Sequence, residues 1–447
     1  MKLNLFLWSI LASCLFFSAQ LNGQVPIVFS LKQAQDYAYE NNYDLKNATY
    51  DVQIANKQVK QNTSIGLPQV NGGIDYMEYF ALPTSLIPGE LIGQPGKEFE
   101  VQFGTRYNLT MRGRVDQLLY SGQYLVGLQT AKAFLESEKE KALRSKIDIR
   151  DQVENSYMVV LLYQEQTKIL DSTYKVVSQM VKELKETLKL GLVEDIEVDQ
   201  LELNKSDLEA RLINTSSQVE INTDRLKFIM GLKENQRIQL TDSLEGFINT
   251  LGREALLQQN FDYNFNIDYN VFKKQEYLVK MQYKLSKTAY QPSLSAFMGF
   301  SDNAQRNVWN FFAPYQSWFK TLNWGMTMTI PIWSSGSRKY TVDQAYLQVQ
   351  KMKVNDEKLK TGLELQVASA RSDFNNAYLI FMNKKKGLEV AVKIYVKTIS
   401  KYKEGVAGST DLNQKYNQFL QSESDYLQSM FTVINLRVQL NKLLEKS

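Results

Sequence analysis

The chain has 447 residues, 44% hydrophobic and 22% charged, a composition that supports a folded protein with a sizeable core and excludes a mainly disordered one. Its 52 basic and 48 acidic residues leave a net charge of +4 without a basic cluster, so no nucleic-acid partner is expected. The lack of histidine and the single cysteine exclude histidine catalysis, histidine metal sites and cysteine–histidine dyads.

Residues 1–23 have the organisation of a secretory signal peptide, with a positive charge at Lys2 before an apolar run from Leu3 to Ala19. The competing interpretation is a membrane-anchoring helix, but the apolar run is short and polar residues follow it. Cys14 lies in the sequence LASC, which fits a lipoprotein processing site, so lipidation stays an open alternative. No later run of about 18 apolar residues follows, so spanning a membrane would require strands.

Long helices are predicted in the mature chain. The first begins at Ser30, where Ser-Leu-Lys-Gln forms a capping box, and ends before Gly66 and Pro68. A second runs from Gln123 to about Leu190 without proline, and its length on the order of 100 Å would exceed a compact domain. The helix that follows has an apolar heptad, which is typical of a coiled-coil seam. Its a positions are Val198, Lys205, Leu212, Val219 and Leu226, and its d positions are Leu201, Leu208, Thr215, Asn222 and Ile229.

Four strands are predicted, at about 70–80, 101–116, 293–300 and 324–333. In the second of them apolar residues at odd positions alternate with polar residues at even ones, as in a strand with one apolar and one polar face. A soluble amphipathic sheet packed on the helices would give the same alternation. Because four strands cannot close a barrel, either the strands lie outside a membrane or several chains share one barrel.

The mature chain, 24–447, is predicted to contain two repeats, at about 31–240 and 254–447. Gly122 and Gly191 are 69 residues apart, and so are Gly336 and Gly405. Each half is predicted to run helix, strand, loop, strand, very long helix, tight turn and helix. Ordered landmarks at one constant interval indicate duplication of a whole structural plan rather than chance repetition of a motif.

The motifs LPQV, QLLYSGQ, IPIWSSGSR, GLVEDIEV and GVAGSTDL, in this order and partly duplicated, give the chain a resemblance to the TolC-type outer membrane efflux family. The resemblance covers nearly all of the mature chain. It implies an α+β membrane protein in the bacterial outer membrane that extends into the periplasm. It further implies a homotrimer whose chains each give four transmembrane strands to a twelve-stranded barrel, above a long coiled-coil α-helical barrel.

The resemblance also implies site residues. The periplasmic hairpin tips, where an adaptor docks in the family, match Gly191, Leu192, Val193, Gly405, Val406 and Ala407. The periplasmic gate matches Asp411, Gln414, Glu197 and Tyr402, with Gln414 replacing a second ring aspartate and Ala407 an arginine of the family's lock. All of these residues could instead be caps or solvated surface. From the strand alternation, Arg106, Arg112 and Arg114 are predicted to line the barrel lumen.

The function implied is an exit duct for active efflux or secretion, working with a periplasmic adaptor (membrane fusion) protein and an inner-membrane efflux transporter or secretion ATPase. No catalytic activity, cofactor or metal is expected of such a duct. The main alternative is a soluble structural coiled-coil scaffold protein. An enzyme based on carboxylates is a weaker alternative, because no acids pair in a pocket-like context.

Overall fold

The computed structural model describes residues 26–93, 95–249 and 252–444. The predicted signal peptide at 1–23 and Cys14 therefore lie outside the described residues. Within the described ranges, no helix has the length and apolar composition needed to cross a bilayer. The chain forms two compact units. The hairpin unit contains the N-terminal segment up to Ala48, Leu143–Ile267 and the C-terminal segment from Gly362, and the sheet unit contains Thr49–Ala142 and Asp268–Thr361.

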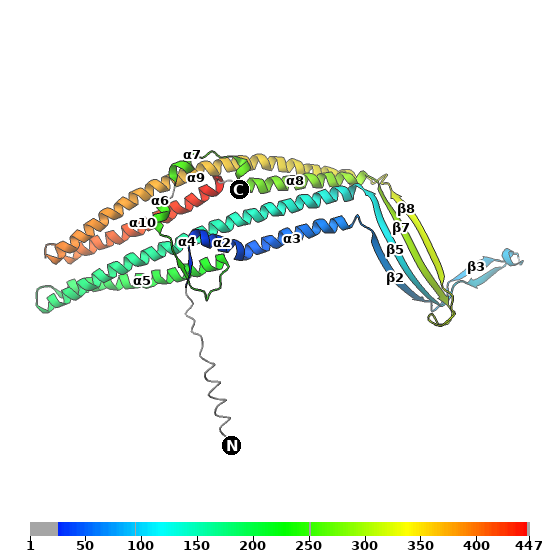
Figure 1. Ribbon diagram of the computed structural model, residues 1–447, viewed down its shortest axis with the longest axis horizontal. Helices are drawn as coiled ribbons and strands as arrows, with labels where there is room; N and C mark the ends of the chain where they lie inside the picture. Colours follow the sequence, from blue (N-terminus) through cyan, green and yellow to red (C-terminus); the bar gives the residue numbers. More distant parts are fainter. Residues whose placement is uncertain (1–25, 94, 250–251, 445–447) are drawn as a thin grey trace, which may run out of the picture. The chain divides into compact units, whose positions relative to one another are not determined.

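The elements in chain order repeat one plan (Figure 1). The helices are α2 (Leu31–Asn41), α3 (Tyr43–Ser64), α4 (Gly122–Lys189), α5 (Asp195–Met230), α6 (Leu244–Asn249), α7 (Arg253–Gln258), α8 (Ile267–Lys287), α9 (Ser337–Lys403) and α10 (Ser409–Leu444), with short 3₁₀ turns at Gly89–Ile92, Tyr263–Phe265 and Thr288–Tyr290. The strands are β1 (Ile27–Phe29), β2 (Gln69–Glu78), β3 (Thr84–Pro88), β4 (Glu98–Gln102), β5 (Tyr107–Ser121), β6 (Ile238–Leu240), β7 (Ser293–Arg306) and β8 (Phe319–Thr329). Helices α5 and α10 both have 36 residues, and their first residues are separated by the same interval as Gly191 and Gly405.

The first predicted helix is divided at Asn42, so the expectation of one uninterrupted helix was wrong. The capping box is present, with Ser30 and Gln33 each accepting from the other's backbone N–H. Asn42 leaves the helical conformation, and its Oδ1 accepts from the backbone N–H of Asp44 and Leu45. An asparagine side chain that accepts from the following amides starts a new helix, and here it ends α2 and begins α3.

The core of the hairpin unit is built from large side chains on α4, α9 and α10, with contributions from α2 and α5. Its fully buried members include Tyr157, Phe374 and Phe381. A second cluster lies between the paired helices, where the rings of Tyr395 and Phe419 stack at 5.4 Å. The predicted seam of α5 faces inward. Val198, Leu201, Leu208, Thr215 and Leu226 are buried, and none of the other predicted a and d positions is exposed.

The sheet unit contains an antiparallel four-stranded sheet in the order β2-β5-β7-β8 (Figure 1). Three predicted strands have different bounds. The strand predicted at 293–300 continues to Arg306, because it pairs with β5 and β8 along its length. The strand predicted at 101–116 begins at Tyr107 and continues to Ser121, because Gly104 takes φ = 108° and breaks the chain direction. Residues before that break belong to β4, which pairs with β3 in a separate hairpin. The last strand is Phe319–Thr329 rather than 324–333, and it ends before Pro331, which has no backbone N–H to donate.

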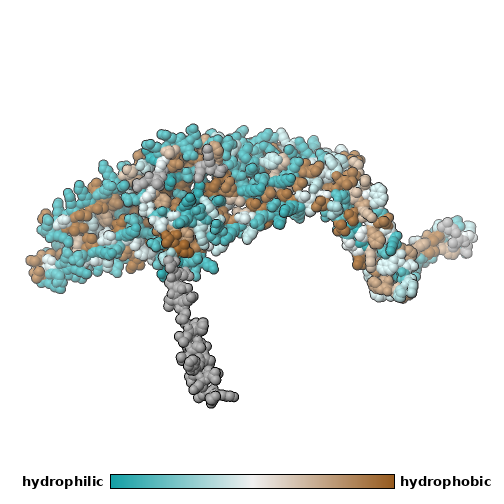
Figure 2. All heavy atoms as spheres, viewed as in Figure 1, coloured by the Kyte–Doolittle hydropathy of each residue, from teal (hydrophilic) through white to brown (hydrophobic). Residues whose placement is uncertain are grey.

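The register divides the sheet into a polar face and an apolar face. The polar face carries Asn71, Asp75, Asn108, Thr110, Arg112, Arg114, Ser301, Asn303, Thr321, Asn323 and Thr327. The apolar face carries Val70, Ile74, Tyr76, Leu109, Met111, Val115, Met298, Phe300, Leu322, Trp324, Met326 and Met328. Among the described residues, the apolar face is covered only at the end of the sheet next to the β7–β8 connection. There Phe311 of that connection packs on Leu109 and Ala304. Trp324 is 76% exposed, and Figure 2 shows hydrophobic residues on the surface of the strand segment.

Candidate functional site

Both hairpin turns in the hairpin unit have the same backbone geometry. Gly191 and Gly405 follow α4 and α9 with φ of 71° and 73°. In the first turn, the N–H of Leu192 donates to the carbonyl of Thr187 at 3.3 Å. In the second, the N–H of Val406 donates to the carbonyl of Lys401 at 2.8 Å. This is the Schellman arrangement that ends a helix at a left-handed residue. A Cβ at either glycine would meet no atom within 4 Å, so the positive φ alone requires glycine.

The turns expose apolar side chains. Leu192 is 72% exposed and Val406 is 73% exposed, and Leu190 is similarly exposed. Val193 and Ala407 are half-buried, whereas both turn glycines lie at the surface. Figure 2 shows hydrophobic residues at these turns on an otherwise mostly hydrophilic pair of hairpins. The six residues predicted for adaptor docking therefore form two small surface turns, each led by an exposed aliphatic side chain.

Tyr402 and Glu197 lie together, as the predicted gate requires. The Tyr402 Oη donates to Glu197 Oε2 at 3.1 Å, which joins the end of α9 to the first turn of α5. Burial, together with the neighbouring Glu197 carboxylate, raises the pKa of Tyr402, because both disfavour the phenolate. The phenol thus remains a hydrogen-bond donor to the carboxylate throughout the physiological pH range.

A second link between the hairpins was missed in the sequence. Lys403 Nζ lies 3.0 Å from Glu183 Oε2, so adjacent residues of α9 reach acids on both helices of the first hairpin. Hydrogen bonds from Gln179 and then from Lys403 hold the pKa of Glu183 below its usual range. In the sequence, the resemblance placed the cation of the family's lock at position 407, where this chain has alanine. The presence of a lysine next to Tyr402, at position 403, was the sequence feature that could have indicated this ion pair.

Asp411 and Gln414 lie one turn apart at the start of α10, and both are exposed. The hydrogen bond between Tyr402 and Glu197 involves neither of them. The structure thus brings together two of the four predicted gate residues, and leaves the other two at the surface of the chain. Their gate role stays a prediction.

The three predicted lumen arginines are not equivalent. Arg112 and Arg114 lie on the polar face, where Arg112 pairs with Asp75 at 3.2 Å and Arg114 with Asp116 at 2.8 Å. Arg106 precedes β5 and pairs with Glu78 at 2.9 Å, at the end of the sheet. Two of the three predicted lumen arginines thus lie within the sheet, and the third lies just before it. A lumen role stays a prediction for each of them.

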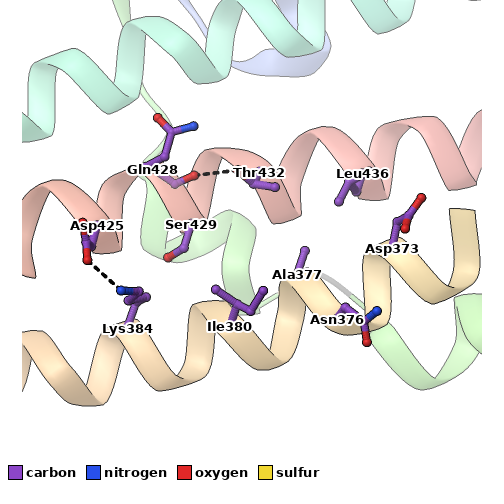
Figure 3. Close-up of a pocket in the computed structure, with 10 residues that line it drawn as sticks. All are labelled: Asp373, Asn376, Ala377, Ile380, Lys384, Asp425, Gln428, Ser429, Thr432 and Leu436. Carbon is purple, nitrogen blue, oxygen red and sulfur yellow. Dashed lines mark hydrogen bonds and ion pairs between the residues drawn. The ribbon is translucent and has the colours of Figure 1, made fainter.

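A groove of about 530 Å³ runs between α9 and α10 in the hairpin unit (Figure 3). Ala377, Ile380 and Leu436 form its apolar part, and Lys384 pairs with Asp425 at 2.6 Å on its rim. A third charged residue of the lining, Asp373, accepts a hydrogen bond from the Ser369 hydroxyl at 3.2 Å. Among the residues that the structure describes, no three acidic, cysteine or histidine side chains are grouped as a metal ion would need.

No family model and no curated protein matches the chain. Several solved structures do match it. CusC, described in terms of folding and transmembrane channel formation, has 16% identity and a TM-score of 0.72 over 93% of this chain and 92% of its own. The CmeC outer membrane channel of Campylobacter jejuni has 17% identity and a TM-score of 0.69 over 93% and 85%. The open-state MtrE outer membrane channel of Neisseria gonorrhoeae has 15% identity and a TM-score of 0.67 over 93% and 88%. At these identities the likeness establishes the fold, and the predicted TolC-like α+β fold is confirmed.

Proposed function

We propose, from the TolC-like fold of the chain, that it is one subunit of a trimeric outer-membrane channel, an exit duct for active efflux or secretion. The observation that carries the proposal is the four-stranded sheet, whose apolar face is left exposed. In water, so many exposed apolar side chains on one face would cost free energy and favour aggregation. In hydrocarbon they are the ordinary outer surface of a transmembrane strand.

The open edges of the sheet support a barrel shared by several copies. Within the described part of the chain, β2 and β8 each pair on one side only. Unpaired N–H and C=O groups facing lipid would cost several kcal/mol each, so a four-stranded sheet is unstable there alone. Pairing β2 of one copy with β8 of the next satisfies both edges. Three copies would give the twelve strands that the resemblance implies.

The helices of the hairpin unit offer a second surface for another copy. On α5, the apolar side chains of Ile196, Leu203, Ile221 and Phe228 are exposed. They lie on the side of the helix away from the buried seam, because residues seven apart share one face. A helix with apolar residues on two opposite sides is expected between two neighbours. One neighbour belongs to the same chain, and we assign the other to the next copy.

The channel would work with a periplasmic adaptor and an inner-membrane transporter or secretion ATPase. The exposed aliphatic side chains of Leu192 and Val406 support adaptor docking at the turns. The Tyr402–Glu197 and Lys403–Glu183 links support a closed state held by contacts between the hairpins. The acidic ring of three Asp411 carboxylates is proposed from the resemblance, and the exposure of Asp411 is compatible with it. Asp411→Asn is the test of that ring. Cation preference and block by divalent ions should both weaken, and unchanged values of both would remove Asp411 from the gate.

The soluble scaffold alternative requires the sheet to pack on the helices, and the exposure of Trp324 and Met326 argues against it. Fractionation of the expressing cells separates the two functions. The channel predicts a protein in the outer-membrane fraction, extracted only by detergent as an oligomer that dissociates on heating. A detergent-free monomer in the periplasm would support the scaffold instead.

A further inference from the structure

A polar cavity of about 470 Å³ lies between three helices of the hairpin unit. Helix α4 contributes Tyr163, Gln166 and Leu170, α5 contributes Arg211, Asn214, Thr215 and Gln218, and α10 contributes Leu420, Glu423 and Ser424. Most of these side chains carry an amide or a hydroxyl group, which can both donate and accept hydrogen bonds. The cavity shares no residue with the hairpin turns, the gate residues or the sheet.

Glu423 is the unusual member of the cavity lining. Its side chain is only 3% exposed, and its Oε1 atom has no hydrogen-bond partner. The neighbouring cation, Arg211, also lines the cavity, but its Nε donates to Asp207 Oδ2 at 2.8 Å and no hydrogen bond joins it to Glu423 Oε1. A buried carboxylate oxygen without a partner is costly, so natural proteins normally pair such a group or protonate it. Here the carboxyl group instead borders an open, polar space of small-molecule size.

The lining favours an organic cation over a metal ion. Divalent metal ions are usually held by several carboxylates, and the described residues contain no such group. An ammonium group needs one carboxylate and a few neutral acceptors, which amide and hydroxyl oxygens supply. We propose that this cavity binds the ammonium group of a small organic amine, with Glu423 as its counter-ion and the amides of Gln166, Asn214 and Gln218 around it.

Protons should compete with the amine for Glu423. Burial raises the pKa of Glu423 to about 7, against the weaker opposite effect of Arg211. The other titratable groups around it are Tyr163 on α4, which lines the same cavity, and Tyr416 on α10, which interacts with Glu423. Asp207 on α5 lies near Tyr416 and is paired with Arg211. Burial raises the pKa of Tyr416 as well, so that phenol stays neutral. The amine therefore binds the ionised carboxylate, and its affinity rises with pH until Glu423 has lost its proton.

The test uses the full detergent-solubilised protein and methylammonium, followed by saturation-transfer NMR of its methyl group. Between pH 8 and pH 5.5 the affinity is expected to fall about thirtyfold, as protonation of a group with a pKa of about 7 dictates. Glu423→Gln keeps the shape of the side chain and removes its charge. It should weaken binding at pH 8 about tenfold or more and abolish the pH dependence.

Glu220→Gln is the matched control, because Glu220 is an exposed acid on α5 outside the cavity. It should leave methylammonium binding unchanged. Circular dichroism of Glu423→Gln verifies that its helices are intact, and Glu423→Asp provides a second variant that keeps the charge and should retain binding. Absence of binding at pH 8, or equal binding to wild type and Glu423→Gln, would overturn the proposal. Equal displacement of methylammonium by potassium would overturn the assignment to an ammonium group.

Discussion

The two units of the chain use apolar side chains in opposite ways. In the hairpin unit, Phe374, Phe381 and Met430 are buried between helices. In the sheet unit, Trp324 and Met326 point out from one face of the sheet and stay exposed. The hairpin unit thus folds around an inner core, whereas most of the apolar face of the sheet is left uncovered. The proposed function accounts for this difference, because it places the helices in water and the apolar face of the sheet in hydrocarbon.

Truncating a core ring in the hairpin unit is expected to have the largest effect. Phe374→Ala should lower the apparent free energy of unfolding by about 3–5 kcal/mol, because it opens a cavity among fully buried side chains. The measurement is denaturant titration followed by the helical circular dichroism signal. Trp324→Ala is the comparison in the sheet, and it should change this helical transition much less. Equal losses from the two changes would contradict the division between a buried and an exposed apolar set.

The next largest effect is expected from placing a charge on the apolar face of the sheet. Met326→Arg should cost about 2–4 kcal/mol if the face lies near the middle of a bilayer. The adjacent Thr327→Arg places the same charge on the polar face and should be tolerated. The yield of oligomer in the outer-membrane fraction reports both variants. If both arginines were tolerated, the apolar face would not contact lipid.

Within the hairpin unit, the links near the turns can be compared with the core. Tyr402→Phe removes the hydrogen bond to Glu197, which is worth about 1 kcal/mol at a half-buried site. Closed-state channels in planar bilayers should then open about five times more often, as a change of that size predicts. Lys403→Gln tests the ion pair with Glu183 in the same assay, and the double variant should open more often than either single one. An unchanged opening frequency in all three would mean that these links do not hold the gate.

An effect as small as that of Tyr402→Phe, and confined to one turn, is expected from changing the turn glycines. Gly405→Ala forces a side chain into the left-handed region and should cost about 1 kcal/mol of local stability. Gly408→Ala lies three residues further on, where φ is not positive, and is the matched control. Amide hydrogen exchange of the last turn of α9 measures the difference. Similar exchange in the two variants would show that the Schellman geometry does not depend on glycine at this turn.

What the sequence could predict was mostly local. The seam of α5 and the glycine turns follow from heptads and from residues close in the chain, and both are present in the structure. The strand predicted at 101–116 was misplaced because alternation continued unbroken through Gly104, although the chain leaves the β3–β4 hairpin there and enters β5. The division at Asn42 was hidden in an otherwise helical pattern, since one side chain capping two amides causes it.

The candidate site was only partly accessible from sequence. The resemblance identified Glu197 and Tyr402, and the structure brings them into contact. Lys403 and Glu183 were missed because their contact depends on how two hairpins align, which spacing within one helix does not report. The partnerless oxygen of Glu423 was missed for a related reason. Its burial arises from three helices that are far apart in the chain.

The central claim, that neighbouring copies complete one barrel, can be tested by cross-linking the two free edges of the sheet. Asn71→Cys on β2 would be combined in turn with a cysteine at Thr321, Asn323 or Thr327 on the same face of β8. The pair Ser301→Cys and Thr321→Cys, opposite each other within one chain, controls for disulfide formation. The account predicts dimers and trimers on a non-reducing gel for at least one β2–β8 pair, and monomers for the control. Monomers at every β2–β8 pair, from a protein whose control disulfide forms, would contradict it.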